Sequence, residues 1–311
     1  FRFIMAEFEL KEGLFTSEEL SSEQYHGLSG TYSSSQLKDC DDPEYFHKKY
    51  ILKEIEKVHI PAFDVGTFFH TSLLEPDKLH LDCAVFTGIR RGKAWDDFQA
   101  THAGKAIITD TEYKVALGLV KAVQESPVSM GRLKRGDPEV SAFIKLRVVG
   151  SFVYAITWGK KLDKYGWVDA KVPAKGTDIW VKVRADLLGE DFILDLKSTT
   201  GNCKDANTLR KKVADLQYDL SASLYLDIFS AARQRIMSNF IWTFSSKDYF
   251  NARSYLASQD MILIGRAKWK KAVIALAEGI ENNWVFQDSM GILNPPAWEY
   301  EIIKEQASDL L

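Results

Sequence analysis

The chain has 311 residues, of which 46% are hydrophobic and 27% are charged, and its formal net charge at pH 7 is −3. This composition predicts an ordinary globular protein with a sizeable core, and no apolar run approaches the length that spans a bilayer. The small negative charge excludes binding of nucleic acid through overall charge, although local basic patches remain compatible with a DNA-binding enzyme.

The three cysteines, Cys40, Cys83 and Cys203, lie far apart and form no C-x-x-C pair. This spacing argues against a disulfide framework, a zinc ribbon or a four-cysteine iron–sulfur cluster. The N-terminus has no basic stretch followed by an apolar run, so no secretory signal is predicted. We therefore expect a cytoplasmic protein with reduced cysteines.

We expect one domain over residues 5–311, beginning at Met5, with residues 1–4 outside it. The domain should consist of three parts along the chain: a helical part over about 30–130, a core over about 135–250 and a second helical part over about 251–311.

The first part contains three segments with helical character, at 34–57, 64–74 and 111–125. Ser33 to Ser35 offer N-caps for the first helix, whereas Pro61 should interrupt the chain before the second. We expect the second helix to end before Pro76 and expect Gly66 to let it approach a sheet closely.

Short segments rich in β-branched and aromatic residues follow, separated by glycines, and they predict strands at 140–149, 152–158, 180–188 and 192–197. The polar segment 160–177 should be a loop or an extended hairpin tip. Apolar spacing then predicts a long helix over 206–233, a strand over 240–244 and mostly helix over 251–285, before an irregular tail at Pro295-Pro296. This order predicts an α/β or α+β fold with a central mixed sheet flanked by helices.

Polar residues interrupt the two strands on either side of the turn at 189–191. In the first strand, Arg184 and Asp186 should face away from the apolar positions, and in the second Asp195 and Lys197 should share one face. A hairpin of these strands can bring Asp186 close to Asp195 and Lys197.

Two carboxylates and a lysine in this arrangement suit metal-dependent hydrolysis of a phosphodiester. The carboxylates can hold one or two hard divalent cations, and Lys197 can orient the attacking water and stabilise developing charge. An isolated Asp-x-Lys is common, however, and a salt-bridged edge strand with Asp195 and Lys197 exposed is the alternative that these residues alone leave open.

Three segments extend the pattern: Arg184-Ala185-Asp186, Leu194-Asp195-Leu196-Lys197-Ser198-Thr199-Thr200 and Tyr218-Asp219-Leu220-Ser221-Ala222-Ser223-Leu224-Tyr225. They resemble the PD-(D/E)XK nuclease superfamily, and within it the exonuclease VIII (RecE)-like branch found in phages and prophages. Further segments resemble other motifs of that branch in the same order: Ser33–Leu37 with Asp42–Tyr45, Gly66–His70 with Leu73–Pro76, Asp137–Phe143, and Pro295–Trp298.

The resemblance implies a restriction-endonuclease-like core and a set of site residues. The implied metal ligands are His70, Asp186, Asp195 and the carbonyl of Leu196. The implied catalytic set consists of Lys197 with Asp186 and Asp195, Glu139 near a second metal or its waters, and Tyr225 in a Gln-x-x-x-Tyr helix motif. The chain departs from this motif, since Ser221 stands where Gln is usual; Gln217, one turn earlier, would share a helical row with Tyr225 and could reach the site.

Contacts to DNA are expected from hydroxyl and basic side chains near the site: Ser33, Ser35, Ser198, Thr199, Arg210 and Lys211. Each has a structural alternative, because Ser33 and Ser35 can cap a helix, Ser198 and Thr199 can end a strand and the basic residues can form a solvated face. Trp95 and Trp269 could stack on bases, although a place in the core is the more usual role of tryptophan.

These features lead us to expect a Mg²⁺-dependent DNA exonuclease, with Mn²⁺ as a substitute. The resemblance implies digestion of linear double-stranded DNA from 5′ to 3′ for recombination, in the cytoplasm of a bacterial host, by a ring-shaped homo-oligomer that works with a single-strand annealing protein and no membrane partner. A single-strand or flap-directed RecB-like nuclease is one alternative, and a catalytically silent DNA-end-binding module is another.

Overall fold

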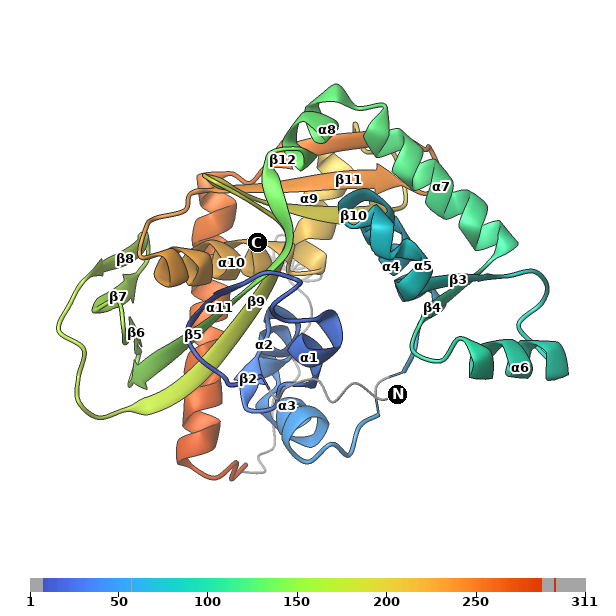
Figure 1. The fold of residues 1–311 in the computed structure, drawn as a ribbon. Helices are drawn as coiled ribbons and strands as arrows, with labels where there is room; N and C mark the ends of the chain where they lie inside the picture. Colours follow the sequence, from blue (N-terminus) through green and yellow to red (C-terminus); the bar gives the residue numbers. More distant parts are fainter. Residues whose placement is uncertain (1–7, 57, 287–293, 295–311) are drawn as a thin grey trace, which may run out of the picture.

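A mixed β-sheet forms the centre of the computed structural model, which describes residues 8–56, 58–286 and 294 (Figure 1). Its main strands follow the order β12-β11-β10-β9-β5-β6-β7-β8. Strands β10 and β11 are parallel, and the other neighbours along this path are antiparallel. Their bounds are β5 Gly136–Val149, β6 Phe152–Ala155, β7 Lys160–Asp163, β8 Gly166–Asp169, β9 Thr177–Gly189, β10 Phe192–Thr199, β11 Asn239–Ser246 and β12 Ala252–Leu256.

Helices cover both faces of this sheet (Figure 1). On one face, α4 (Pro61–Leu74), α7 (Asp110–Gln124) and α8 (Pro127–Leu133) enclose a core in which Phe69 and Leu119 pack with Leu194 and Leu196. On the other face, α9 (Ala206–Asp215), α10 (Tyr218–Arg233) and α11 (Gln259–Glu281) enclose a second core. The expected α/β fold with a central mixed sheet is therefore confirmed.

Smaller elements complete the structure. In the N-terminal segment these are β1 Gly13–Phe15, α1 Ser22–Gly27, β2 Thr31–Tyr32, α2 Ser34–Lys38, η1 Asp39–Asp41, α3 Pro43–Phe46 and the π-helical turn η2 His47–Ile51. After α4 come η3 Pro76–Lys78, α5 Leu79–Asp82, β3 Cys83–Phe86, α6 Lys93–Thr101 and β4 Ala106–Thr109. Strands β3 and β4 form a separate parallel pair that extends with α6 away from the main sheet (Figure 1).

Each predicted strand is present, although the one expected over 152–158 ends at Ala155. Within the segment 160–177, residues 160–169 form the β7–β8 hairpin, which agrees with the expected extended hairpin tip. The helix predicted over 111–125 is confirmed as α7, and the one predicted over 64–74 as α4. Pro61 does not interrupt the chain but occupies the first turn of α4, where its missing N–H leaves no hydrogen bond unmade.

The prediction of a single helix over residues 34–57 is wrong. Short helical pieces replace it because Pro43 disfavours helical backbone at the preceding residue. Asp42 is accordingly extended, with φ −119° and ψ 93°, and its side chain caps the new helix α3 by accepting a hydrogen bond from the N–H of Tyr45.

The long helix predicted over 206–233 is also wrong, because the chain breaks between α9 and α10. Gln217 at the break is left-handed, with φ 49°, and Lys38 donates to the freed carbonyl of Leu216 at 2.8 Å. The apolar spacing was misleading here since Leu216 is 51% exposed and belongs to no buried stripe.

The prediction of helix over 251–285 holds only for α11. Residues 252–256 form β12 instead, which pairs with the edge of β11. Among the described residues, no helix is both long and apolar enough to cross a membrane. The segments at 1–4 and 295–298 lie outside the described residues.

Candidate metal centre

Strands β9 and β10 separate next to the polar residues that the sequence singled out. They pair only where Ile193 faces Leu188 and Leu194 faces Leu187. Beyond that point β2 occupies the edge of β9, at Trp180 and Val181. Asp186 lies where the two strands diverge, and its Oδ2 accepts a hydrogen bond of 2.6 Å from the N–H of Leu196. The strands thus form a fork that leaves backbone and carboxylate atoms of the sheet centre available to a ligand.

Three potential metal ligands from three elements meet at this fork. They are His70 of α4, Glu139 of β5 and Asp186 of β9, and one ligand atom from each lies within 4.8 Å of the others. His70 Nδ1 is 3.5 Å from Asp186 Oδ2. The register of β5 with β9 places Glu139 opposite Asp186, between the flanking pairs Pro138–Leu187 and Val140–Ala185.

Glu139 has an unusual backbone for a residue in a strand. Its φ is 52°, in the left-handed region that a non-glycine residue adopts at a cost of about 1–3 kcal/mol. Arg184 fixes its side chain, since Nε of Arg184 donates to Glu139 Oε2 at 2.8 Å. Backbone strain of this kind is commonly found at functional sites.

Asp195 and Lys197 project from β10 on the side of α10. Lys197 Nζ donates to Asp195 Oδ1 at 2.6 Å, and the Asp195 carboxylate is not part of the group formed by His70, Glu139 and Asp186. Only 12% of the Asp195 side chain and 26% of the Lys197 side chain are accessible. The alternative of an edge strand with both side chains exposed to solvent is therefore wrong. That Asp186 and Asp195 share a metal remains a prediction.

Burial and neighbouring charges shift the pKa values of the ionisable side chains at the fork. Burial and the nearby Asp195 raise the pKa of Asp186 to about 7. Burial and Asp186 raise the pKa of Glu139, while burial and Lys197 lower the pKa of His70, which keeps its imidazole neutral at pH 7. Burial opposes the charge on Lys197, but Asp195 and Asp186 hold its pKa above the usual value.

This set of donors fits a divalent cation. Carboxylate and carbonyl oxygens with one neutral imidazole are ligands that Mg²⁺ and Mn²⁺ accept, and a positive ion would relieve the mutual repulsion of the carboxylates. The Leu196 backbone hydrogen-bonds to His70 and so lies beside the set; that its carbonyl binds the metal remains a prediction.

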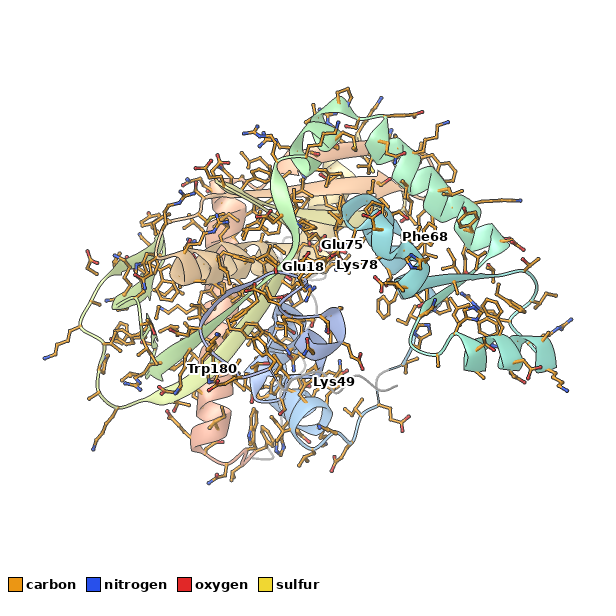
Figure 2. The ribbon with its side chains drawn as sticks, viewed as in Figure 1. Glu18, Lys49, Phe68, Glu75, Lys78 and Trp180 are labelled. Atoms are coloured by element: carbon orange, nitrogen blue, oxygen red, sulfur yellow. The ribbon has the colours of Figure 1, made fainter. Side chains whose placement is uncertain are left out.

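A cleft of about 1390 Å³ surrounds the fork. Its walls are the N-terminal segment and one face of α4, and Ser198 and Lys247 contribute from β10 and the β11–β12 turn. Figure 2 shows Glu75 and Lys78 side by side near the end of α4. There Ser17 of the N-terminal segment donates to Glu75 at 2.7 Å and accepts from Lys78 at 3.1 Å, so the two walls are joined at this end.

The predicted DNA-binding residues divide into two groups. Ser33, Ser35 and Ser198 line the cleft, and Ser33 also occupies the N-cap position of α2, where its backbone N–H donates to Gln36. Thr199 does not line the cleft and accepts a hydrogen bond from Lys212 at 2.8 Å. Arg210 and Lys211 are exposed on α9, outside the lining of the cleft.

The residues of α10 differ from the expected row. Tyr225 lines the cleft and hydrogen-bonds to Ser34, whereas neither Gln217 nor Ser221 lines it. Gln217 cannot share a helical row with Tyr225 because it precedes α10 in a left-handed conformation, and its amide lies 3.4 Å from Asp41.

Tyr218 is a site residue that the sequence analysis missed. Its ring centroid is 5.3 Å from Lys197 Nζ and also 5.3 Å from Lys38 Nζ, so two ammonium groups contact one aromatic ring. Burial and Lys197 lower the pKa of Lys38 to about 8. The spacing of seven residues between Tyr218 and Tyr225 was the available signal, since it places both on one helix face.

The two tryptophans considered for base stacking have partners within the protein. Trp269 is fully buried and donates to Asp227 at 3.0 Å, which places it in the core. Trp95 packs edge-on against Phe86, with ring centroids 5.1 Å apart. Neither of them lines the cleft.

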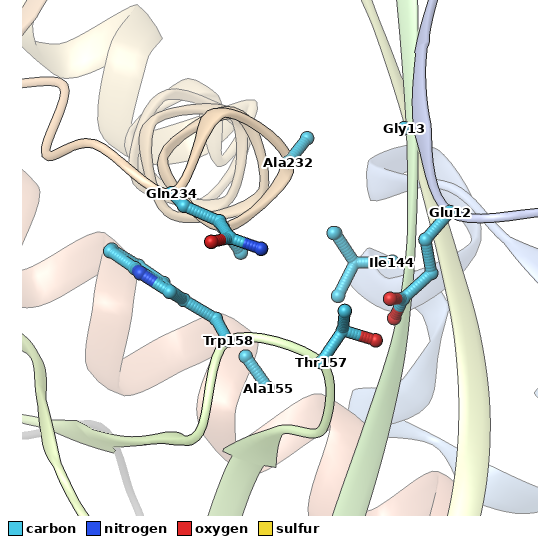
Figure 3. Close-up of a pocket in the computed structure, with 9 residues that line it drawn as sticks. Glu12, Gly13, Ile144, Ala155, Thr157, Trp158, Ala232 and Gln234 are labelled. Carbon is cyan, nitrogen blue, oxygen red and sulfur yellow. The ribbon is translucent and has the colours of Figure 1, made fainter.

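A smaller cavity of about 130 Å³ lies between the end of α10 and the turn after β6. Figure 3 shows Gln234 and Trp158 on one side of it and Glu12 and Thr157 on the other. It shares no lining residue with the cleft, and Glu12 already accepts the N–H of Lys145 at 2.7 Å. This cavity is therefore separate from the candidate metal centre.

Comparison with known proteins gives one match to a family and several to solved structures. Residues 33–283 match the family described as a PDDEXK-like domain of unknown function (DUF3799). A crystal structure of a candidate exonuclease from Eubacterium rectale aligns with a TM-score of 0.56 at 13% identity, over 92% of this chain and 97% of that chain, and shows likeness of fold. The structure of SSO0001 aligns with a TM-score of only 0.27 at 14% identity, over 66% of this chain and 85% of that chain. No curated protein matches.

Proposed function

This chain belongs to the PDDEXK-like family DUF3799, and from that membership and the fork site we propose that it is a Mg²⁺-dependent nuclease that hydrolyses phosphodiester bonds of linear double-stranded DNA. One observation carries the proposal: His70, Glu139 and Asp186 converge in a large cleft that is also lined by Lys197, the ion-pair partner of Asp195. The expected membership of the PD-(D/E)XK superfamily is confirmed at the level of this family.

The residues of the fork have different roles in the proposed hydrolysis. His70, Glu139, Asp186 and Asp195 would hold the cation, together with the Leu196 carbonyl. The cation, when bound, lowers the pKa of its water and polarises a phosphoryl oxygen. Arg184 keeps Glu139 in place through the 2.8 Å hydrogen bond, which limits the freedom of a ligand side chain.

Lys197 acts as a positive donor rather than as a base. Asp195 and Asp186 hold its pKa above the usual value, so it keeps its proton at neutral pH. A protonated ammonium beside the site can orient the attacking water and stabilise charge that develops on the phosphoryl oxygens. Asp195 fixes this ammonium at 2.6 Å.

Digestion from a DNA end is supported by two features. The structural neighbour from Eubacterium rectale is described as a candidate exonuclease, and the resemblance of the motifs is to the exonuclease VIII-like branch. The tether of Ser17, Glu75 and Lys78 joins the two cleft walls on one side, which favours a strand end over a continuous duplex.

The remaining aspects of the proposal rest on the resemblance of the motifs. They are 5′-to-3′ polarity, use of Mn²⁺ in place of Mg²⁺, a role in recombination with a single-strand annealing protein, a ring-shaped homo-oligomer, and a phage or prophage origin with action in the cytoplasm of the bacterial host.

The proposal is tested with a linear duplex labelled separately at each 5′ and each 3′ end, incubated with Mg²⁺, Mn²⁺ or EDTA. We expect stepwise loss of the 5′ label with either metal and no loss in EDTA. Asp186→Asn and Lys197→Met should lower the rate by at least about 100- to 1000-fold. Lys121→Met, an exposed lysine on α7 outside the cleft, is the matched control and should cleave normally.

Full activity in both site variants would refute the assignment of the site. Circular duplex and single-stranded DNA are the further substrates: preference for the single strand would favour the RecB-like alternative. Binding of ends without cleavage under any metal would favour the silent module.

A further inference from the structure

Gly66 lies in the interior of α4, one turn before His70, and contributes to the lining of the cleft. Glycine inside a helix lowers helix stability relative to alanine, because its backbone loses more freedom on folding. A glycine at this place therefore needs a reason that the structure should reveal.

The two usual structural requirements for a glycine are both absent at Gly66. Its φ is not positive, so the position does not require the backbone freedom of glycine. A Cβ built on Gly66 would have no heavy atom within 4 Å, so no neighbouring element approaches closely. The expected close approach of this helix to the sheet at Gly66 is thus wrong; buried Val65, Phe68 and Phe69 pack toward the core instead.

A third reason for glycine is close approach of a ligand. Gly66, Thr67 and His70 follow Phe63 at spacings of three, four and seven residues along α4, so the four residues share one helix face. All four residues line the cleft. A ligand that reaches the metal ligand His70 along this face must pass over Gly66.

Phe63 lies at the other end of the same face. It is 61% exposed, and among the described residues no aromatic ring or cation stacks on it. Seven residues of helix separate it from His70 by about 10 Å, which corresponds to about three nucleotides of one DNA strand. Single exposed apolar residues are common, but this one is aligned with the clearance at Gly66 and with the metal centre.

We propose that the Phe63–His70 face of α4 is the binding surface for one strand of the nucleic acid, with its sugar–phosphate backbone passing over Gly66 and a base stacked on Phe63. This inference rests on the proposed nuclease function and deepens it. Asp64 also lines the cleft, but it is largely covered, since only 13% of its side chain is accessible and its carboxylate is 3.1 Å from Nε2 of His59.

Gly66→Ala separates a ligand role of this glycine from a structural role. If the glycine were needed for the fold, the substitution would lower Tm; if it makes room for a ligand, the substitution should raise Tm and weaken binding. The substitution should raise Tm by about 1–3 °C, as alanine favours the helix. It should also weaken binding of a fluorescent linear duplex, measured with Ca²⁺ in place of Mg²⁺, by about tenfold or more. Gly131→Ala is the matched control: Gly131 lies in α8, has open space around a built Cβ and does not line the cleft, so only Tm should rise.

The larger variant Gly66→Leu should bind still more weakly while remaining folded. Binding and cleavage at wild-type levels in both Gly66→Ala and Gly66→Leu would overturn the inference.

Stacking on Phe63 is tested with 2-aminopurine placed at each of the first five nucleotides of one strand. A base stacked on Phe63 should lose fluorescence on binding, at a position about three nucleotides from the cleaved bond. Phe63→Leu should abolish this quenching, and Phe63→Trp should retain it. Tyr165→Leu, which removes a 69% exposed aromatic ring between β7 and β8, is the control and should leave the quenching intact.

The outcomes distinguish this inference from the proposed function. Wild-type protein that cleaves DNA, with unchanged binding in the Gly66 variants and unchanged quenching in Phe63→Leu, would overturn the α4 surface alone. Wild-type protein that neither binds nor cleaves DNA would overturn both.

Discussion

Asp186 shares the fork of β9 and β10 with Glu139 and Asp195, and burial together with the charge of Asp195 raises its pKa to about 7. A raised carboxyl pKa means that the ionised form is less stable in the folded protein than in the unfolded chain. Without a cation, the buried Asp186 carboxylate therefore opposes folding, and the rest of the chain has to offset this cost.

Asp186→Asn should consequently stabilise the metal-free protein. In EDTA at pH 8, we expect the free energy of unfolding to rise by about 1–2 kcal/mol, measured by urea denaturation. Mg²⁺ should stabilise the wild-type protein and leave the variant unchanged. Equal loss of stability in EDTA and in Mg²⁺ would instead make Asp186 a structural residue.

Tyr218 gives a second prediction for a single residue. Its ring contacts the ammonium groups of both Lys38 and Lys197, at 5.3 Å each, and cation–π contacts contribute about 0.5–2 kcal/mol. Tyr218→Phe keeps the ring and should retain most of the cleavage rate. Tyr218→Ala should lower kcat by about 3- to 30-fold and also lower Tm, because the ring packs against the second core. A rate in Tyr218→Phe as low as that in Tyr218→Ala would show that the hydroxyl matters and not the ring.

The sequence identified Asp186, Asp195 and Lys197 because alternation along strands fixes their faces, and it added His70 and Glu139 through the order of the motifs. It could not predict the positive φ of Glu139, which depends on the register of β5 with β9. Tyr218 was missed because its contact with Lys197 requires α10 to pack over β10.

Helix α7 shows how the small β3–β4 pair is fixed to the domain. Thr109 and Glu112 form a capping box at its N-terminus, and Glu112 also accepts two hydrogen bonds of 2.7 Å from Arg90. Burial would raise the pKa of Glu112, but the Thr109 N–H and Arg90 lower it below 4.5. The folded state thus binds a proton less readily than the unfolded chain.

It follows that Glu112 stabilises the fold above about pH 4.5 and that this contribution is lost as the pH falls through the lower folded pKa. Glu112→Gln should cost about 1 kcal/mol at pH 7 and progressively less as the pH falls below 4.5, measured by urea unfolding at a series of pH values. Glu125→Gln, an exposed residue 3.6 Å from Lys121, should not change the stability at any of these pH values. A pH-independent cost would indicate lost packing and not lost charge.

At the scale of elements, strands were predicted well because their β-branched runs end at glycine turns. Helices were predicted less well wherever a single residue decided the path of the chain. Pro43 divides the first helical region, and the left-handed Gln217 divides the long helix into α9 and α10. Strand β12 forms because the edge of β11 is available to it, which no local pattern of residues 252–256 reveals.

In the whole molecule, one sheet separates two cores, and the candidate metal centre lies where strands β9 and β10 of that sheet diverge. The core under α4 and α7 and the core under α10 and α11 contact opposite faces of β9 and β10. His70 comes from the first layer and Tyr218 from the second, with Asp186 and Lys197 between them. The net charge of −3 did not reveal this arrangement, since the functional charges are concentrated in the cleft.

The central claim is that the fork binds a divalent cation and that Lys197 is needed for hydrolysis but not for metal binding. Calorimetric titration of the protein with Mn²⁺ tests this claim most directly. Wild-type protein and Lys197→Met should both bind the metal, although only the wild type should cleave DNA, while Asp186→Asn should bind at least about tenfold more weakly. Undiminished binding in Asp186→Asn, or no binding by the wild-type protein, would contradict the account.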